Sequence, residues 1–383
     1  MVPQSGVELL DVTNSTDPNF TQAYATDLDG TLIWAYDFPD RKTDSIIQPI
    51  KQLPNGNFLL IISYASQQLV DGIPNNGEIV LLREIDLAGN PVRQITADQL
   101  NRKLQSAGFN LVTYDFHHDF AVLPNGHVVI LANALQPSSN GPAKSGTQNV
   151  VGDALVDLDT QFNPVWVWNS FDHLDLSRRP MGFPDWTHSN SILYTDDGNL
   201  LLSIRHQNWV IKVDYENGAG TGNVIWRLGP GGDFKLLNGN DPQDWFYAQH
   251  SPNFIGTRSS GVFSMILMDN GDDRVVSPGN ACNGTSGPNC YTTVPVFSVD
   301  EAARTATLTF HKVFPPEQYS LWGGSANPLA NGNYEFDLCA QPNTTSEINE
   351  VLPTGELVWK MTSTGANFYR GNRISSLYPG VQW

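Results

Sequence analysis

The feature that most constrains the fold of this 383-residue chain is a strand-and-turn unit that recurs along it. The unit has an Asp-bearing strand, an aromatic strand, a loop, and then a Leu-x-Asn-Gly turn that leads into an apolar strand. The glycines of these turns recur about every 70 residues, at Gly56, Gly126, Gly198, Gly261 and Gly332. Because the pattern has no helical periodicity, a repeat of this length predicts the blades of a β-propeller and not a helical solenoid.

Six such units predict an all-β, six-bladed β-propeller with four short strands in each blade. Residues 1–383 are expected to form one domain. Each twisted sheet of a propeller buries both faces against its neighbours, and closure of the ring removes exposed sheet edges. The opening segment GVELLDV resembles a strand and precedes the first unit. We expect this N-terminal strand to close the ring by joining the last blade.

Composition limits the classes of partner. Hydrophobic residues make up 40% of the chain and charged residues 16%, which is typical of a cored protein and not of a disordered one. The net charge of −18 argues against nucleic acid, whose phosphates require a basic surface. No apolar run is long enough to predict a membrane span, and the first ten residues lack the pattern of a signal peptide.

Two of the three cysteines lie at the ends of a short loop. Cys282 and Cys290 enclose the sequence CNGTSGPNC, which favours a disulfide over two free thiols, and its spacing is not that of a zinc site. A disulfide indicates an oxidising compartment, so we expect a periplasmic or secreted protein. Cys339 is expected to be a buried free thiol.

Histidines occupy one position of successive units. His117 and His118, His188, and His250 all come shortly before the turn of the second, third and fourth unit. Equivalent positions in adjacent blades lie at the same radius and height, so these imidazoles are expected to converge. Asn190 and Arg205, on either side of the third turn, are expected to join them.

The residue types favour binding of an oxyanion. Three histidines are a common zinc site, but Arg205 is a permanent cation that repels a divalent ion. Imidazole and guanidinium groups together suit sulfate, phosphate or carboxylate, so we expect neither a metal nor a cofactor. His206 follows Arg205 directly and is expected to face away, by strand alternation. Acidic residues before His250 are expected to cap turns and not to bind calcium: Asp233, Asp241 and Asp244.

These motifs resemble the bacterial arylsulfate sulfotransferases, the type that does not use phosphoadenosine phosphosulfate as donor. The resemblance is carried by HHDFAVLPNG (117–126), WTHSNSILYTDDGNLLLSIRHQNWVIKVD (186–214), NVIWRLG (223–229) and QHSPNFIG (249–256). It covers the whole propeller and implies a six-bladed fold. Larger members of the family carry an additional N-terminal β domain, which is expected to be absent here.

The resemblance implies a ping-pong transfer of a sulfuryl group from an aryl sulfate to a phenol through a sulfohistidine. His250 then corresponds to the nucleophile, and Arg205, His188 and Asn190 to the groups that hold the sulfuryl oxygens. His118 is expected to complete the pocket as an oxyanion donor or proton shuttle. It is preferred to His117 because it adjoins Asp119. The expected partners are a small aryl sulfate and a phenolic acceptor.

Aromatic side chains beside these residues are candidates for an aryl site, chiefly Trp186 and Tyr247, although ordinary blade core is the alternative for both. Two other functions stay open at this point. A propeller lyase or lactonase that acts on an anionic sugar could use the same histidines and arginine. A propeller without catalysis could serve as a binding platform, because this fold has many functions.

Overall fold

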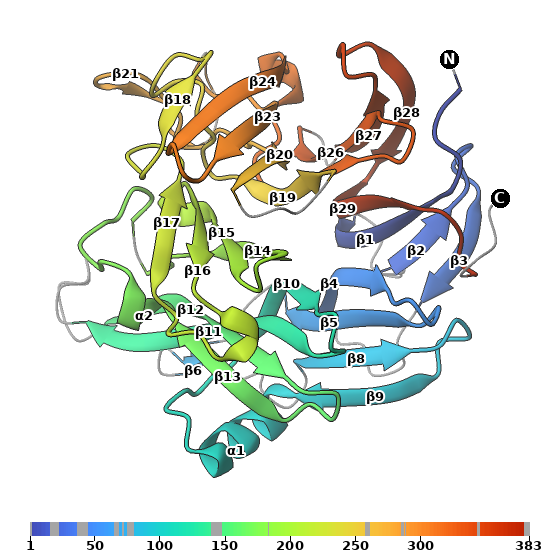
Figure 1. Cartoon of the computed structure of the whole chain (residues 1–383). Helices are drawn as coiled ribbons and strands as arrows, with labels where there is room; N and C mark the ends of the chain where they lie inside the picture. Colours follow the sequence, from blue (N-terminus) through green and yellow to red (C-terminus); the bar gives the residue numbers. More distant parts are fainter. Residues whose placement is uncertain are drawn as a thin grey trace.

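A computed structural model shows the expected propeller (Figure 1). The structure describes residues 2–15, 23–36, 45–64, 69–70, 73–74, 80–138, 148–182, 184–256, 261–284, 287, 289–342 and 345–378.

Six antiparallel sheets surround one centre (Figure 1). The first contains β29 (Ala366–Ile374), β1 (Val7–Ser15), β2 (Ala23–Thr26) and β3 (Leu32–Tyr36). The second contains β4 (Ser45–Gln52), β5 (Phe58–Tyr64), β8 (Leu81–Ile85) and β9 (Pro91–Thr96). The third contains β10 (Phe116–Val122), β11 (Val128–Ser138), β12 (Gln148–Leu158) and β13 (Pro164–Asn169).

The other three sheets follow in chain order. The fourth contains β14 (Ser189–Tyr194), β15 (Leu200–Ile204), β16 (Trp209–Val213) and β17 (Val224–Leu228). The fifth contains β19 (His250–Ile255), β20 (Val262–Met268), β23 (Thr293–Asp300) and β24 (Thr305–Val313), with β18 (Lys235–Leu237) added in parallel at its edge. The sixth contains β25 (Ser325–Pro328), β26 (Tyr334–Gln341), β27 (Thr345–Val351) and β28 (Leu357–Thr364).

Several short elements lie outside the six sheets. They are two small hairpins, β6 (Leu69–Val70) with β7 (Ile73–Pro74) and β21 (Val275–Ser277) with β22 (Asn280–Ala281), the helices α1 (Ala97–Ala107) and α2 (Ser170–His173), and the 3₁₀ turns η1 (Arg205–Gln207), η2 (Glu216–Gly218) and η3 (Pro316–Gln318). Among the described residues, no helix has the length and apolar character needed to cross a membrane.

One strand of each sheet lines the centre of the ring. These inner strands are β4, β10, β14, β19, β25 and β29, and each contacts the next around the circle. The recurring turns join an inner strand to the second strand of its blade. Their glycines have left-handed backbones, for example Gly56 at φ 88° and Gly126 at φ 83°, which a residue with a Cβ adopts only with strain.

The ring closes through the two ends of the described chain. β1 pairs antiparallel with β29 from Val7 opposite Ile374 to Ser15 opposite Ala366. The N-terminal strand therefore takes part in closure as expected. In detail, β29 alone comes from the C-terminal side of the chain and supplies the inner strand, while β1, β2 and β3 complete that blade.

A buried charge network, the closure seam, fastens this junction. It consists of Glu8, Asp11, Glu335, Asp337 and Arg373. The Arg373 guanidinium contacts Glu8, lies 3.2 Å from Glu335 Oε2, and also reaches Glu350 at 3.1 Å. Both carboxylate oxygens of Asp337 are buried without a hydrogen-bond partner among the described residues. Burial raises the pKa of Glu8, Glu335 and Asp337 above the ordinary range, so protonation of these acids is favoured.

The helix α1 was not predicted by the repeat. Thr96 caps its start by accepting a hydrogen bond from the Gln99 backbone, and the Gln99 side chain reciprocates. Gly108 ends the helix in a left-handed conformation. Leu100 and Leu104 are buried in the core between the second and third blades, so α1 covers the outside of the ring and leaves the centre to the inner strands.

Candidate active site

The backbone turns the predicted histidines towards the channel at irregular points of three inner strands. Register is interrupted in β10 between Phe116 and Phe120, at the start of β14, and in β19 after His250. His118 (φ 58°), His188 (φ 51°) and Ser251 (φ 46°) adopt the left-handed conformation at these interruptions. That conformation costs an ordinary residue on the order of 1–3 kcal/mol and is concentrated at functional sites.

The imidazoles converge as the spacing predicted. The ring of His118 lies 4.7 Å from that of His188, and both His118 and His250 lie edge-on to Tyr369, at 5.7 and 5.9 Å between centroids. His188 also stacks on His206 at 4.6 Å. We call His117, His118, His188, His206 and His250 the histidine cluster.

His250 is held in one tautomer. Its Nδ1 lies 2.7 Å from Asn270 Oδ1, and the Asn270 amide nitrogen donates to the carbonyls of Ser320 and Gly323. The Asn270 oxygen must therefore face the ring and accept from Nδ1–H. Nε2 keeps its lone pair, which accepts a long bond of 3.3 Å from the Gly323 amide. Burial, and next the charge of Arg205, hold the pKa of His250 well below its usual range, so the ring is neutral.

Arg205 supplies a fixed positive charge beside His250. It begins the 3₁₀ turn η1 and not a strand. Its Nη2 lies 2.5 Å from Asp272 Oδ2, and its Nη1 donates to His206 Nε2 at 2.8 Å. Arg205 Nε is buried without a hydrogen-bond partner among the described residues. The guanidinium is therefore oriented on one side and keeps a donor unused.

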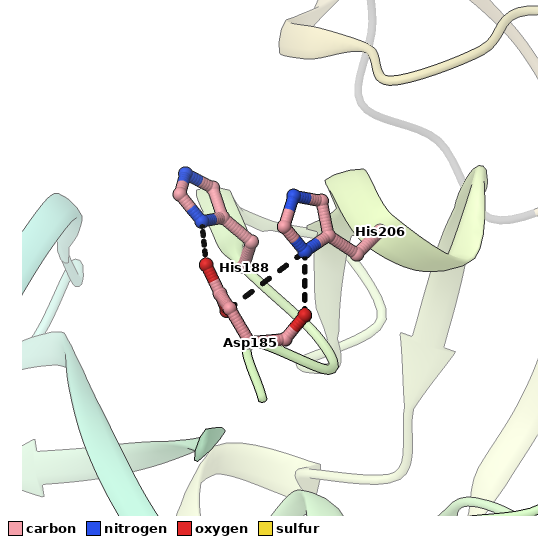
Figure 2. Close-up of side chains that lie close together, drawn as sticks. All are labelled: Asp185, His188 and His206. Carbon is pink, nitrogen blue, oxygen red and sulfur yellow. Dashed lines mark hydrogen bonds and ion pairs between the residues drawn. The ribbon is translucent and has the colours of Figure 1, made fainter. Parts of the chain in front are cut away.

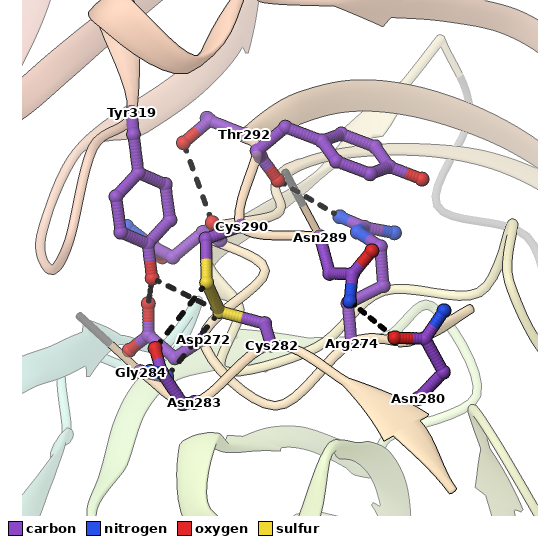
Figure 3. The surroundings of a disulfide bond; sticks show 12 residues. Asp272, Arg274, Asn280, Cys282, Asn283, Gly284, Asn289, Cys290, Thr292 and Tyr319 are labelled. Carbon is purple, nitrogen blue, oxygen red and sulfur yellow. Dashed lines mark hydrogen bonds between the residues drawn. A yellow bond between two sulfur atoms is a disulfide. The ribbon is translucent and has the colours of Figure 1, made fainter. Parts of the chain in front are cut away.

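Asp272 links Arg205 to the disulfide. Its Oδ1 accepts from the Tyr319 hydroxyl at 2.7 Å, and Tyr319 packs against the bond between Cys282 and Cys290 (Figure 3). Burial raises the pKa of Asp272 to about 6 despite the neighbouring Arg205. The predicted disulfide is thus present and supports a carboxylate that orients the arginine, and Cys339 is the buried free cysteine expected.

Asp185 organises the other side of the cluster (Figure 2). Its carboxylate accepts from His188 Nδ1–H at 2.5 Å, and its backbone carbonyl accepts from His206 Nδ1–H at 2.8 Å. The pKa of Asp185 is lowered on balance: burial opposes this, but the charge and hydrogen bond of His188 outweigh it. The expectation that His206 faces away is wrong, because η1 replaces strand geometry there.

The donor atoms of Asp185, His188 and His206 lie within 4.8 Å of one another, close enough to suggest a metal site. The hydrogen bonds argue against that use. His206 donates through Nδ1 and accepts from Arg205 through Nε2, so both ring nitrogens are occupied. Burial lowers the pKa of His206 to about 4, consistent with a neutral ring that accepts from a cation. The group does not fit a cation next to Arg205.

Both members of the His117–His118 pair enter the cluster, with different roles. His117 Nε2 lies 3.2 Å from Asp153 Oδ1, and its Nδ1 lies 2.9 Å from His118 Nδ1. Burial opposes protonation of His117, yet Asp153 raises its pKa on balance. Burial, and next the nearby His188, hold the pKa of His118 well below the usual range. His118 therefore accepts from His117 and keeps Nε2–H for a ligand.

The reason given for preferring His118 was wrong. The carboxylate of Asp119 does not pair with His118 but accepts from Lys51 at 2.5 Å and from Arg370 at 3.1 Å. The acid partners of the cluster are instead Asp153 for His117 and Asp185 for His188. The expected turn capping is confirmed for Asp233 and Asp244, which accept from the backbone of Arg227 and Asn240.

Of the remaining predicted residues, Asn190 has an unpaired polar atom, whereas Trp186 and Tyr247 are packed in the interior. Asn190 is fully buried in β14, donates to the Gln249 carbonyl at 2.6 Å, and has an amide oxygen without a partner among the described residues. Trp186 and Tyr247 are 0% and 2% exposed. Trp186 stacks on Phe171, and Tyr247 belongs to an apolar core cluster. The aryl contacts expected of these two rings stay a prediction.

Comparison with known proteins now decides the family. The family model described as Arylsulfotransferase (ASST) matches residues 2–370, nearly the whole chain. The chain belongs to the arylsulfotransferase family. Membership identifies it as an aryl sulfotransferase enzyme that acts on small aryl molecules. The recognition made from the motifs around His118, His188, Arg205 and His250 is confirmed.

One of the similar solved structures, the first below, supports the fold, and it supports the fold alone. A protein of unknown function from Bacteroides caccae is similar with a TM-score of 0.50 and 10% identity, covering 96% of this chain and 98% of that one. A Lactobacillus plantarum protein has a TM-score of 0.43 and 10% identity, covering 97% and 99%. An α-L-arabinofuranosidase from Clostridium thermocellum has a TM-score of 0.37 and 13% identity, covering 86% and 97%. A search of curated proteins finds no match.

Several residues of the site were missed from the sequence: Asp185, Asn270, Asp272, Tyr319, Tyr369 and Arg370. A signal existed for the last two. The segment NFYRGN follows the last of the six repeat units in sequence, but it forms the inner strand β29 and occupies the place that the histidines have in other blades. Asn270 and Asp272 reach the site through local turns that the repeat does not describe.

Proposed function

We propose that this arylsulfotransferase moves a sulfuryl group from a phenolic sulfate ester to a phenol by a ping-pong mechanism with a sulfohistidine at His250. The observation that carries the proposal is the tautomer of His250: a neutral ring whose Nδ1–H is held by Asn270 and whose Nε2 lone pair accepts only the long bond from the Gly323 amide, which a substrate can replace. A neutral imidazole beside a fixed cation is the arrangement that nucleophilic attack on an anionic ester requires.

In the first half-reaction, His250 Nε2 attacks sulfur, and the bond between sulfur and the aryl oxygen breaks. The aryl oxygen leaves with the bonding pair and takes a proton from His118 Nε2–H while His117 Nδ1–H passes its proton to His118 Nδ1, or it takes a proton from water. In the second half-reaction, the acceptor phenol gives its proton to His118 Nε2 as its oxygen attacks sulfur, His118 Nδ1 returns a proton to His117, and the S–N bond returns its electrons to His250. Both steps balance without an external oxidant or cofactor.

The surrounding groups stabilise the charge on the non-bridging oxygens. Arg205 and His188 are assigned to these oxygens because the charge of each acts on His250, and Arg205 Nε is a buried donor without a partner among the described residues. Asn190 is assigned by the family resemblance and would donate through its amide nitrogen, which also bonds the Gln249 carbonyl. Asp185 fixes His188 with Nδ1–H pointing to the carboxylate, so Nε2 of His188 faces the cluster. Groups that are oriented before the substrate arrives lose little energy to reorganisation during the reaction.

The test is transfer from 4-nitrophenyl sulfate, with and without phenol. The proposal predicts nitrophenol release that depends on phenol, and a peptide containing His250 that gains the mass of one SO₃ group when phenol is omitted. Release of sulfate to water at the same rate without phenol contradicts the transferase mechanism. A modified peptide elsewhere contradicts the assignment of the nucleophile.

We also infer a periplasmic or secreted location. The support is the disulfide between Cys282 and Cys290, since such bonds persist in oxidising compartments. Alkylation of the protein isolated directly from cells distinguishes the cases: both cysteines blocked against alkylation supports the inference, and both alkylated without prior reduction contradicts it.

A further inference from the structure

A second cavity lies along the inner strands, apart from the histidine cluster. It has a volume of about 290 Å³ and is lined by residues near the ends of inner strands, including Lys51, Asn253, Asn327 and Asn372. None of the clustered histidines is among its lining residues. Asp119 and Ser251 directly follow His118 and His250 in their strands, so this rear cavity begins behind the cluster and extends towards the ends of β4 and β29.

Three charged side chains lie between the rear cavity and the histidine cluster. Asp119 accepts from Lys51 Nζ at 2.5 Å and from Arg370 Nη1 at 3.1 Å. Among the residues that line the rear cavity these three side chains carry all the formal charge, two positive and one negative. The lining of the rear cavity therefore has more positive than negative charge, and the buried Asp11, which accepts from the Arg370 backbone and whose pKa burial raises to about 7, offsets only part of it. An anionic group balances the remainder.

Unused hydrogen-bonding groups also line it. Arg370 Nε and Ser251 Oγ are buried, and neither has a hydrogen-bond partner among the described residues. Arg370 is 5% exposed and Ser251 3%. A buried polar group without a partner costs about 1–3 kcal/mol, so both favour a ligand that supplies one.

The amides point to hydroxyl groups on that ligand. The side-chain nitrogen of Asn253 already donates to the Ala326 carbonyl and to Asn327 Oδ1, both at 2.9 Å. The nitrogen of Asn327 donates to the Gly371 carbonyl at 3.1 Å. Asn327 Oδ1 is thus already used, and Asn253 Oδ1 is the amide oxygen left to bind, to which a hydroxyl group donates.

We propose that the rear cavity binds a small polyhydroxylated carboxylate of the size of a sugar acid. Its carboxylate pairs with Lys51 and Arg370, and its hydroxyl groups bind Asn253 and Ser251. The cavity is close to the lower end of the volumes typical of small-molecule sites, about 300 Å³. The proposal does not depend on sulfuryl transfer, because none of these residues touches the reacting atoms.

The experiment is isothermal titration of the full chain with D-gluconate, with D-glucitol as the uncharged probe of equal carbon number and acetate as the charged probe without hydroxyls. We expect gluconate to bind at least about 10-fold more tightly than either, because a hydrogen bond to a charged group contributes about 1.5–3 kcal/mol. Equal binding of glucitol contradicts the charge argument, and no binding of gluconate overturns the proposal.

Variants locate the binding. Lys51→Met removes one cation, and Asn372→Phe fills the cavity without changing charge, so each is expected to weaken gluconate binding at least about 10-fold. Lys103→Met, on the outer helix α1, is the matched control and leaves binding unchanged. His250→Ala also leaves it unchanged, which separates this site from the sulfuryl site. Binding that persists in both Lys51→Met and Asn372→Phe, with folding verified by circular dichroism, overturns the assignment.

Discussion

The histidine cluster and the closure seam are two buried polar networks built around an arginine, and the same physical effect acts on both. Burial favours the neutral form of any titratable group. In the cluster it lowers the pKa of His118 and His250, and in the seam it raises the pKa of Glu335 and Asp337. An imidazole that becomes neutral loses a proton and exposes a nucleophilic lone pair. A carboxylate that becomes neutral gains a proton and loses its negative charge.

The two arginines differ in what remains unused. Arg373 of the seam contacts the carboxyl groups of Glu8, Glu335 and Glu350. Burial opposes ionisation of Glu350, but hydrogen bonds from Asn333 and Asn331 outweigh burial and lower its pKa, so this carboxylate balances the charge of Arg373 within the fold. Arg205 of the cluster has one carboxylate partner, Asp272, and one neutral partner, His206. The cluster therefore has a net attraction for an anion, and the seam has none. Comparable burial therefore gives a candidate active site in the histidine cluster and a structural junction in the closure seam.

Removal of the nucleophile gives the largest expected effect. His250→Ala should reduce sulfuryl transfer by on the order of 10⁴ or more, because no other imidazole can replace the attacking nitrogen. Single-turnover release of nitrophenol is the measurement. His127→Ala, a histidine that bonds Asp157 away from the cluster, is the control. Comparable losses in the two variants would mean that His250 is structural.

Removal of each arginine sharpens the comparison. Arg205→Met should lower kcat/KM by roughly 10²–10³, the typical loss for one donor to a developing charge, with a smaller fall in melting temperature than Arg373→Met, because only Asp272 loses its cation. Arg373→Met should do the reverse, since it leaves buried carboxylates unpaired at a cost of roughly 3–5 kcal/mol. Thermal denaturation and kinetics measured on both proteins test this, and an Arg205 variant with unaltered kcat/KM contradicts the assigned role.

Asp185 should have a smaller effect on catalysis. Asp185→Asn keeps the shape but removes the charge that orients His188, and we expect a loss of roughly 10–100-fold in kcat/KM, as for carboxylates that orient ligand histidines. Asp175→Asn, an exposed turn carboxylate bonded to Ser177, is the matched control. If the two substitutions behave alike, the orientation of His188 has no part in catalysis.

The smallest expected effect is a pH dependence of the free energy of unfolding that arises from the closure seam. Burial raises the pKa of Asp11 from 3.8 to about 7. The stability from its neutral form is complete below pH 4 and is lost as pH rises through 7. Asp11→Asn should therefore be about as stable as the parent at pH 5 and more stable by roughly 1–3 kcal/mol at pH 8. Urea unfolding at both pH values measures it, and a gain confined to pH 5 contradicts the sign.

The fold was predictable because the repeat records it directly. Gly56, Gly126 and Gly198 mark turns that only a few residues can form, so their spacing fixes the blade length. The helix α1 was not predicted, because a single capping box, Thr96 with Gln99, is a much weaker signal than six repeated units. Its residues nonetheless contained the start signal and, in Gly108, the stop signal.

The site was predictable where chemistry coincides with the repeat, as for His188 and His250. It was not predictable where the backbone leaves the strand pattern. His206 was misplaced because η1 interrupts alternation, and Asp119 was misassigned because Lys51 and Arg370, distant in sequence, take its charge. Tyr369 was missed because ring closure, which no local pattern describes, brings β29 beside the histidines.

That placement of β29 has a consequence for biosynthesis. Tyr369 and Arg370 are among the last described residues to leave the ribosome, yet they stand between His118 and His250 at the centre. A nascent chain cannot present a finished pocket until this strand has emerged and paired with β1. Catalytic competence is thereby tied to the synthesis of β29, and a chain terminated before this strand would lack the ring of Tyr369 beside its imidazoles.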